Sequence, residues 1–190
     1  TLSKNLEKMD CNAFGNCDGL TQIEIPKSLD VGGDYYSGAF ADCANLKKVT
    51  FERGTTKIAS NLLCGCTGIE KIDIPDTVKV IQVCAFKECK NLSTVNIPES
   101  VTEIGSKEFY ECISLSNVNI PDSVTKIGGY AFYQCKNLVN VILSKNLEKI
   151  DCNAFGNCDG LTQIEIPKSL DIGGDYYSGA FADCANLKKV

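Results

Sequence analysis

The sequence contains no histidine and no tryptophan among its 190 residues, and its only methionine is Met9. Without histidine, the most frequent general base of enzymes and the most frequent neutral metal ligand are both absent. No apolar run approaches the roughly 18 residues that a membrane-spanning helix needs. Acidic residues outnumber basic ones, giving a formal net charge of −5. These absences argue against an enzyme, a metal or other cofactor, a membrane span and a nucleic-acid partner.

Proline is scarce, and its positions reveal a repeat. All five prolines open the same phrase, which recurs every 23 residues over 75–97, 98–120 and 121–143. Three further copies carry serine or glutamate in place of the proline, at 3–25, 52–74 and 144–166. The copy at 26–51 has 26 residues, and a second longer copy begins at Pro167. The sequence therefore predicts about eight coils of 23–26 residues.

Each coil shows the same distribution of apolar residues. The coil at 121–143 ends in an alternation typical of a β-strand, then turns at a proline and continues into a second short extended segment. The segment that follows, with its Ala-Phe pair, is too short for more than one turn of helix. One coil cannot bury its apolar side chains alone, whereas stacked coils can. In this coil the side chains expected inside are Val124, Ile127, Ala131, Phe132, Cys135, Leu138, Val141 and Leu143.

The repeated pattern L-x-x-[IV]-x-[IL]-P-x-x-V-T-x-I-G-x-x-A-F-x-x-C resembles the leucine-rich repeat of the BspA type, found in surface proteins of bacteria and some protozoa. The resemblance covers essentially the whole chain. It implies a right-handed α/β-type solenoid of short parallel strands with 3-10 or irregular turns. It further implies a concave strand face, roles in adhesion and protein binding, and a location that is secreted or at the cell surface. The departures are Leu62-Leu63 in place of Ala-Phe, and Glu108 in the alanine position.

Equivalent positions in stacked coils should form columns. One column should hold phenylalanine, with Leu63 as a substitute, and another should hold eight of the twelve cysteines. For this cysteine column we favour buried free thiols over disulfides or a metal site, because neighbouring side chains point the same way. Cys11, Cys84 and Cys152 lie outside the column and are expected to be more accessible. A buried Glu108 would need a cation or an outward tilt, and we expect the tilt.

The chain also contains a longer copy of itself. Residues 2–49 recur as 143–190 with 46 of 48 identical, at an offset of 141 residues. We expect residues 1–190 to form one domain taken from a longer array, since neither end resembles a polar cap. The register would also allow Val190 to be followed by Thr1, so end-to-end self-association is a further expectation.

Two loops interrupt the repeat, as VGGDYYSGAF at 31–40 and IGGDYYSGAF at 172–181. Tyrosine beside glycine, serine and aspartate is a mixture typical of binding loops. The alternative is that the tyrosines only cover neighbouring turns. The candidate binding residues of the loops are Asp34, Tyr35, Tyr36, Asp175, Tyr176 and Tyr177.

The concave strand face is the other candidate surface. Its outward positions are mostly polar, and an ordinary solvated strand face would have the same composition. The candidate binding residues on this face are Lys47, Lys48, Asp73, Asn96, Asn119, Asn140 and Ile142. The leading hypothesis is a non-catalytic module that binds a host or matrix protein, or a glycan. The alternative is a structural spacer or self-stacking rod with no specific ligand.

Overall fold

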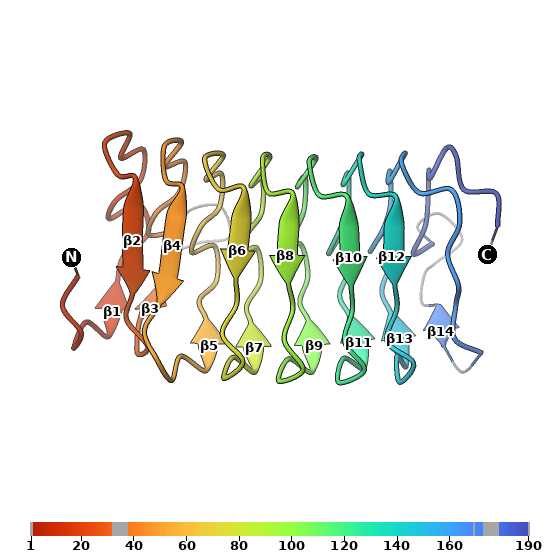
Figure 1. Cartoon of the computed structure of the whole chain (residues 1–190), viewed down its shortest axis with the longest axis horizontal. Helices are drawn as coiled ribbons and strands as arrows, with labels where there is room; N and C mark the ends of the chain where they lie inside the picture. Colours follow the sequence, from red (N-terminus) through yellow and green to blue (C-terminus); the bar gives the residue numbers. More distant parts are fainter. Residues whose placement is uncertain (1, 32–37, 169, 173–178, 190) are drawn as a thin grey trace.

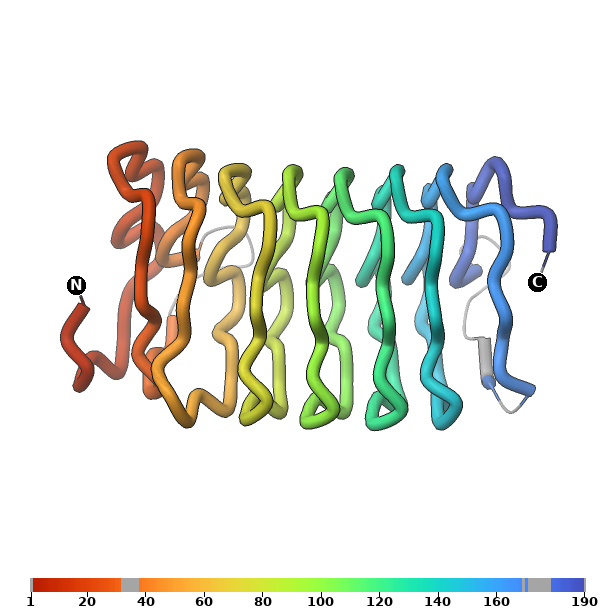
Figure 2. The backbone as a smooth tube through the Cα atoms, viewed as in Figure 1, coloured from red at the N-terminus to blue at the C-terminus, as the bar shows by residue number. Residues whose placement is uncertain are grey.

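The computed structural model describes residues 2–31, 38–168, 170–172 and 179–189. The chain winds into an elongated stack of similar coils, with one end of the stack at each terminus (Figure 1). In every coil the chain runs down the front, crosses below, rises at the back and advances towards the C-terminal end. This path is a right-handed solenoid, as the resemblance implies (Figure 2).

The front of the stack holds the longer strands, which come from the alternating apolar segment of each coil. Their outward side chains form what we call the front face. Parallel ladders join these strands in pairs, β2 with β4, β6 with β8 and β10 with β12. The strands are β2 (Gln22–Ile25), β4 (Lys48–Phe51), β6 (Lys71–Asp73), β8 (Thr94–Asn96), β10 (Asn117–Asn119) and β12 (Asn140–Ile142).

The back of the stack holds two-residue strands, which follow the proline turns. Six of them form a continuous parallel sheet in the order β14-β13-β11-β9-β7-β5, and β1 pairs with β3. Between β3 and β5, the Nζ of Lys57 pairs with Oδ1 of Asp30 at 3.1 Å. The strands are β1 (Lys8–Met9), β3 (Asp30–Val31), β5 (Lys57–Ile58), β7 (Val80–Ile81), β9 (Glu103–Ile104), β11 (Lys126–Ile127), β13 (Lys149–Ile150) and β14 (Asp171–Ile172).

The third side of each coil, which we call the turn side, contains the Ala-Phe segment. Most turns contain two residues with a left-handed backbone, one before the Ala-Phe pair and one before the column cysteine, as at Cys84 (φ 60°) and Glu88 (φ 59°). Among the described residues, the turns of the two longer coils contain one each, Asp42 and Asp183. The amides of Cys84 and Glu88 bond the next coil, so that Cys84 N donates to Ser106 O and Glu88 N to Tyr110 O. Equivalent bonds recur from Asn12 to Ala182. The turn side is therefore a hydrogen-bonded seam along the stack.

The core consists of the predicted columns. All eight residues expected inside the 121–143 coil are at most 8% exposed. The phenylalanine rings stack on one another, with centroids 5.2 Å apart for Phe109 and Phe132 and 5.0 Å apart for Phe132 and Phe155. Leu63 takes its place in the column fully buried. Burial of this continuous apolar interior is the main source of stability for a coil that cannot fold alone.

The solenoid of short parallel strands is confirmed, with two corrections. The turn side holds turns and no helix of any kind among the described residues, so the irregular-turn alternative applies and the 3-10 alternative does not. The regular array also has about six turns, slightly fewer than the eight coils expected. Six turns carry a front strand, and after β12 the described front face has only an isolated bridge between Gln163 and Lys189.

Two predictions for single residues were wrong. Cys84 is fully buried rather than accessible, because its turn-side position places the side chain inward beneath the next coil. Glu108 is fully buried as well, and does not tilt outward. Its Oε1 accepts a hydrogen bond from the backbone N–H of Gly105 at 2.6 Å, while no described residue donates to Oε2.

Candidate functional site

As between β8 and β10, the front face is interrupted between β4 and β6. These strands are neighbours, but no ladder joins them. A groove of about 410 Å³ lies there, between residues 47–51 on one side and Lys71, Asp73, Ile74 and Pro75 on the other. This volume falls within the range of about 300–1,000 Å³ that is usual for ligand pockets. We call it the β4–β6 groove.

The coil after β4, beside the groove, opens with an unusual sequence. This coil opens with Glu52, Arg53 and Gly54 instead of a proline phrase, and Gly54 has a left-handed φ of 86°. Thr55 closes the turn by donating its backbone N–H and its hydroxyl to Glu52 O, at 3.1 and 2.7 Å. Glu52 in turn accepts from the Lys27 amide at 3.1 Å. The turn is thus bonded to its own coil and to the coil that precedes it.

One end of the groove is basic. Lys47 and Lys48 come from β4 and the residue before it, and Lys71 comes from β6. Nζ of Lys71 lies 2.9 Å from Oδ1 of Asp73, and both side chains are largely exposed. The groove lining thus carries three ammonium groups and one carboxylate, while Glu24 and Glu70 are exposed beside it on the same face.

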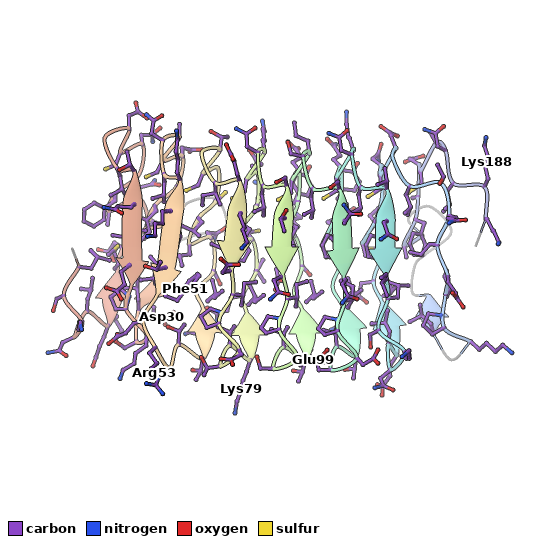
Figure 3. All side chains as sticks on the ribbon, viewed as in Figure 1. Asp30, Phe51, Arg53, Lys79, Glu99 and Lys188 are labelled. Carbon is purple, nitrogen blue, oxygen red and sulfur yellow. The ribbon has the colours of Figure 1, made fainter. Side chains whose placement is uncertain are left out.

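Apart from Thr50, the rest of the groove is apolar. Val49 and Ile74 are buried below it, and Phe51 is half-buried at the lower end of β4 (Figure 3). The equivalent position in other coils holds a smaller isoleucine or leucine, such as Ile25 or Leu143. The groove therefore combines an aromatic and aliphatic floor with a cationic rim, which suits binding rather than chemistry.

The structure divides the predicted front-face residues into two groups. Lys47, Lys48 and Asp73 line the β4–β6 groove. The others lie on β8, β10 and β12 as an exposed amide strip, in which Asn119 is paired in register with Ile142. Val139 and Ile142 are 52% and 56% exposed and add an apolar edge. The members predicted from the sequence are Asn96, Asn119, Asn140 and Ile142. The candidate loop residues Asp34, Tyr35, Tyr36, Asp175, Tyr176 and Tyr177 lie outside the described residues.

Two features were not predicted. Phe51 and Pro75 line the groove, and the phenylalanine in an isoleucine column was the available signal. On the turn side, Tyr110 and Tyr133 stack with centroids 5.3 Å apart, and Tyr130 packs edge-on against Tyr133 at 5.2 Å. Tyrosine at the same position of two consecutive coils was the signal there.

All twelve cysteines are free, and six of the eight column cysteines are buried as expected, whereas Cys17 and Cys184 are only partly buried. From Cys43 onwards, each column thiol donates to the carbonyl of the phenylalanine column in the coil before it; Cys112 Sγ lies 3.3 Å from Phe86 O. Burial raises the pKa of the Cys66 thiol to about 12 and that of Cys64 to about 11. Such thiols stay protonated at neutral pH and are poor nucleophiles. Within the described part of the chain, no group of three or more cysteine or acidic residues could hold a metal.

Stacked parallel strands, aligned core columns and a polar front face define a leucine-rich-repeat solenoid. The model of the BspA-type leucine-rich repeat region matches in six copies, over residues 1–113 and 56–188. The chain belongs to this family. No curated protein matches it. The described residues include no helix that is both long and apolar enough to cross a membrane.

Three solved structures show the same fold at 24% identity. A leucine-rich repeat protein from Bacteroides ovatus has a TM-score of 0.62 and is matched over 99% of this chain and 58% of its own. The leucine-rich repeat protein of T. pallidum has a TM-score of 0.64, with coverages of 95% and 71%. A leucine-rich cell surface protein from Faecalibacterium prausnitzii has a TM-score of 0.54, with coverages of 96% and 56%. The chain thus spans just under three fifths of the length of the Bacteroides and Faecalibacterium proteins.

Proposed function

We propose that this chain is a non-catalytic binding module of a surface or secreted protein, and that it holds a protein or glycan partner on its front face. The observation that carries the proposal is the β4–β6 groove, because it combines a cationic rim with an apolar floor on the strand face. The surface location is supported by the Faecalibacterium protein of the same fold, which is described as a cell surface protein.

The amide strip on β8, β10 and β12 extends the same face. Its asparagines can donate and accept hydrogen bonds, and the exposed Val139 and Ile142 can contact apolar groups of a partner. A stack of coils places the groove and the strip side by side on one surface. A partner that spans both would gain affinity from two moderate contacts rather than one strong contact.

The test is to probe an array of glycans and matrix proteins with the 190-residue chain and with two charge-balanced variants. The front-face variant carries K48E, D73K and N119A, and the control carries K79E and E103K at exposed positions behind the front face. We expect saturable binding to at least one partner, with Kd raised about tenfold or more by the front-face changes only.

A second variant separates the front face from the loops. It carries serine at Tyr35, Tyr36, Tyr176 and Tyr177. Loss of binding in this variant, with binding kept in the front-face variant, would move the site to the loops and overturn the proposal. Concentration-dependent fibres without any saturable partner would favour the self-stacking rod instead.

A further inference from the structure

We propose that the β4–β6 groove binds an extended acidic segment of a partner protein, with carboxylates against the lysines and an apolar side chain against Phe51. This inference rests on the proposed function and adds the chemical class of the partner. It follows from the charge of the rim, the composition of the floor and the course of the two strands.

The charge of the rim selects an acidic partner. Lys47 and Lys48 take part in no ion pair between described residues, and Asp73 is the only acid that lines the groove. The Lys71–Asp73 pair is exposed to solvent, and ion pairs of this kind contribute little to stability. A carboxylate of the partner can therefore contact Lys71 at little cost.

The floor favours a peptide over a saccharide. Binding of sugar hydroxyls requires amide, hydroxyl or carboxyl groups in convergent positions, whereas no asparagine or glutamine lines the groove and Asp73 is the one carboxyl in its lining. The one hydroxyl of the groove, that of Thr50, donates to Ile23 O at 3.4 Å. The remaining surface is that of Val49, Phe51, Ile74 and Pro75, which fits an aliphatic or aromatic side chain.

The course of the strands favours an extended segment. β4 and β6 run in the same direction along the two walls, and the basic residues lie towards their starts while Phe51, Ile74 and Pro75 lie at their ends. A segment lying along the groove would therefore meet charge first and apolar surface second. A segment in which acidic residues are followed by a leucine or phenylalanine matches this order.

The internal duplication provides a matched control for charge. Lys188 and Lys189 are the copies of Lys47 and Lys48, with the same neighbours from Leu187 back through Gly179. Both are exposed, Lys188 lies at the far end of the stack from β4 and β6, and neither lysine lines the β4–β6 groove (Figure 3). The pair K188E/K189E therefore changes the net charge by the same amount as K47E/K48E without touching the β4–β6 groove.

The experiment measures fluorescence polarisation of a labelled peptide, acetyl-EEFEELEE, with the 190-residue chain at 50 and 300 mM NaCl. We expect K47E/K48E to raise Kd about tenfold or more, and K188E/K189E to raise it less than about twofold. F51L keeps an aliphatic side chain at the site and should weaken binding about threefold or more. The peptide acetyl-EEGEEGEE, which lacks apolar side chains, should bind more weakly, and higher salt should weaken both peptides. Thermal unfolding of each variant checks that it is folded.

Equal effects of the two lysine pairs would show a non-specific charge effect and would overturn the inference. Binding of a chondroitin sulfate tetrasaccharide at the groove, without binding of the peptide, would also overturn it and would leave the proposed function standing. If the array partner is unaffected by the front-face variant and the peptide does not bind, both proposals fail.

Discussion

Glu108 is a carboxyl side chain in a core column that otherwise holds alanine or leucine. It is fully buried between Ala85 and Ala131, the residues of the same column in the adjacent coils. Burial raises the pKa of this carboxyl well above 4.5, and the hydrogen bond from Gly105 N–H offsets only part of the effect. At pH values between the unfolded and folded pKa of Glu108, the folded protein therefore keeps a proton that the unfolded chain releases.

This proton predicts a pH dependence. Because the folded pKa is raised, the contribution of Glu108 to stability is fully present below about pH 4.5 and is lost as the pH rises through the folded pKa. E108Q, which is neutral at all pH values, should lack this loss. Between pH 4.5 and 8, urea unfolding should show the wild type losing stability relative to E108Q.

The control is E103Q, which changes an exposed carboxyl of the same coil. Its pH profile should follow that of the wild type. Parallel profiles for E108Q and the wild type would mean that Glu108 is ionised or exposed in the folded protein.

For single residues, the sequence predicted the core columns well, because equivalent positions of successive coils lie in the same environment. It failed for residues that break the column. The tilt expected for Glu108 was wrong because the adjacent alanines leave space for a longer side chain, and the Gly105 amide supplies one partner. Cys84 was assigned to an accessible turn because the sequence does not show that the next coil covers that turn.

The turns are the elements that join the coils. Each contains one or two left-handed residues, and half of these are Asn or Asp, which tolerate this backbone conformation. Gln134 takes it with a φ of 58°, whereas Gly65 occupies the equivalent position of another coil with a φ of 72°. A β-carbon at such a position costs about 1–2 kcal/mol.

Replacing Gln134 by glycine should therefore stabilise the protein, by about 0.5–1 kcal/mol after the entropy lost from the unfolded chain is included. The backbone N–H of residue 134 would keep its bond to Gly156 O. Q134A keeps the β-carbon and should give no gain. Denaturant unfolding measures both changes, and a gain of equal size in Q134A would show that the left-handed backbone is not the cause.

The strands themselves were predictable, but the interruption of the front face was not. Alternation and β-branched residues place β2 to β12, and the register follows from the repeat length. Whether two neighbouring strands form a ladder depends on how far one coil is displaced relative to the next. The sequence of a single coil does not determine this displacement. The longer coil at 26–51 and the missing proline at Glu52 were the only signs of an irregularity here.

At the scale of the whole molecule, the turn side and the front of the stack differ in how continuously hydrogen bonds join the coils. The turn side bonds successive coils from Asn12 to Ala182, whereas the front strands join only in pairs. The aromatic column runs beneath the turn side, so hydrogen bonding and ring stacking stabilise the same seam. The front face is thereby left to vary in sequence and in spacing, which suits a surface that binds.

Amide hydrogen exchange, measured residue by residue by NMR, tests this central claim most directly. The amides of Phe86, Phe109 and Phe132 donate across the turn side at 2.7–3.1 Å from fully buried positions, and they should exchange only through global opening. The amides of β6 (Lys71–Asp73), beside the β4–β6 groove, should exchange faster through local opening. Protection of β6 equal to that of the three phenylalanines would contradict the account, because it would show a front sheet as continuous as the turn side.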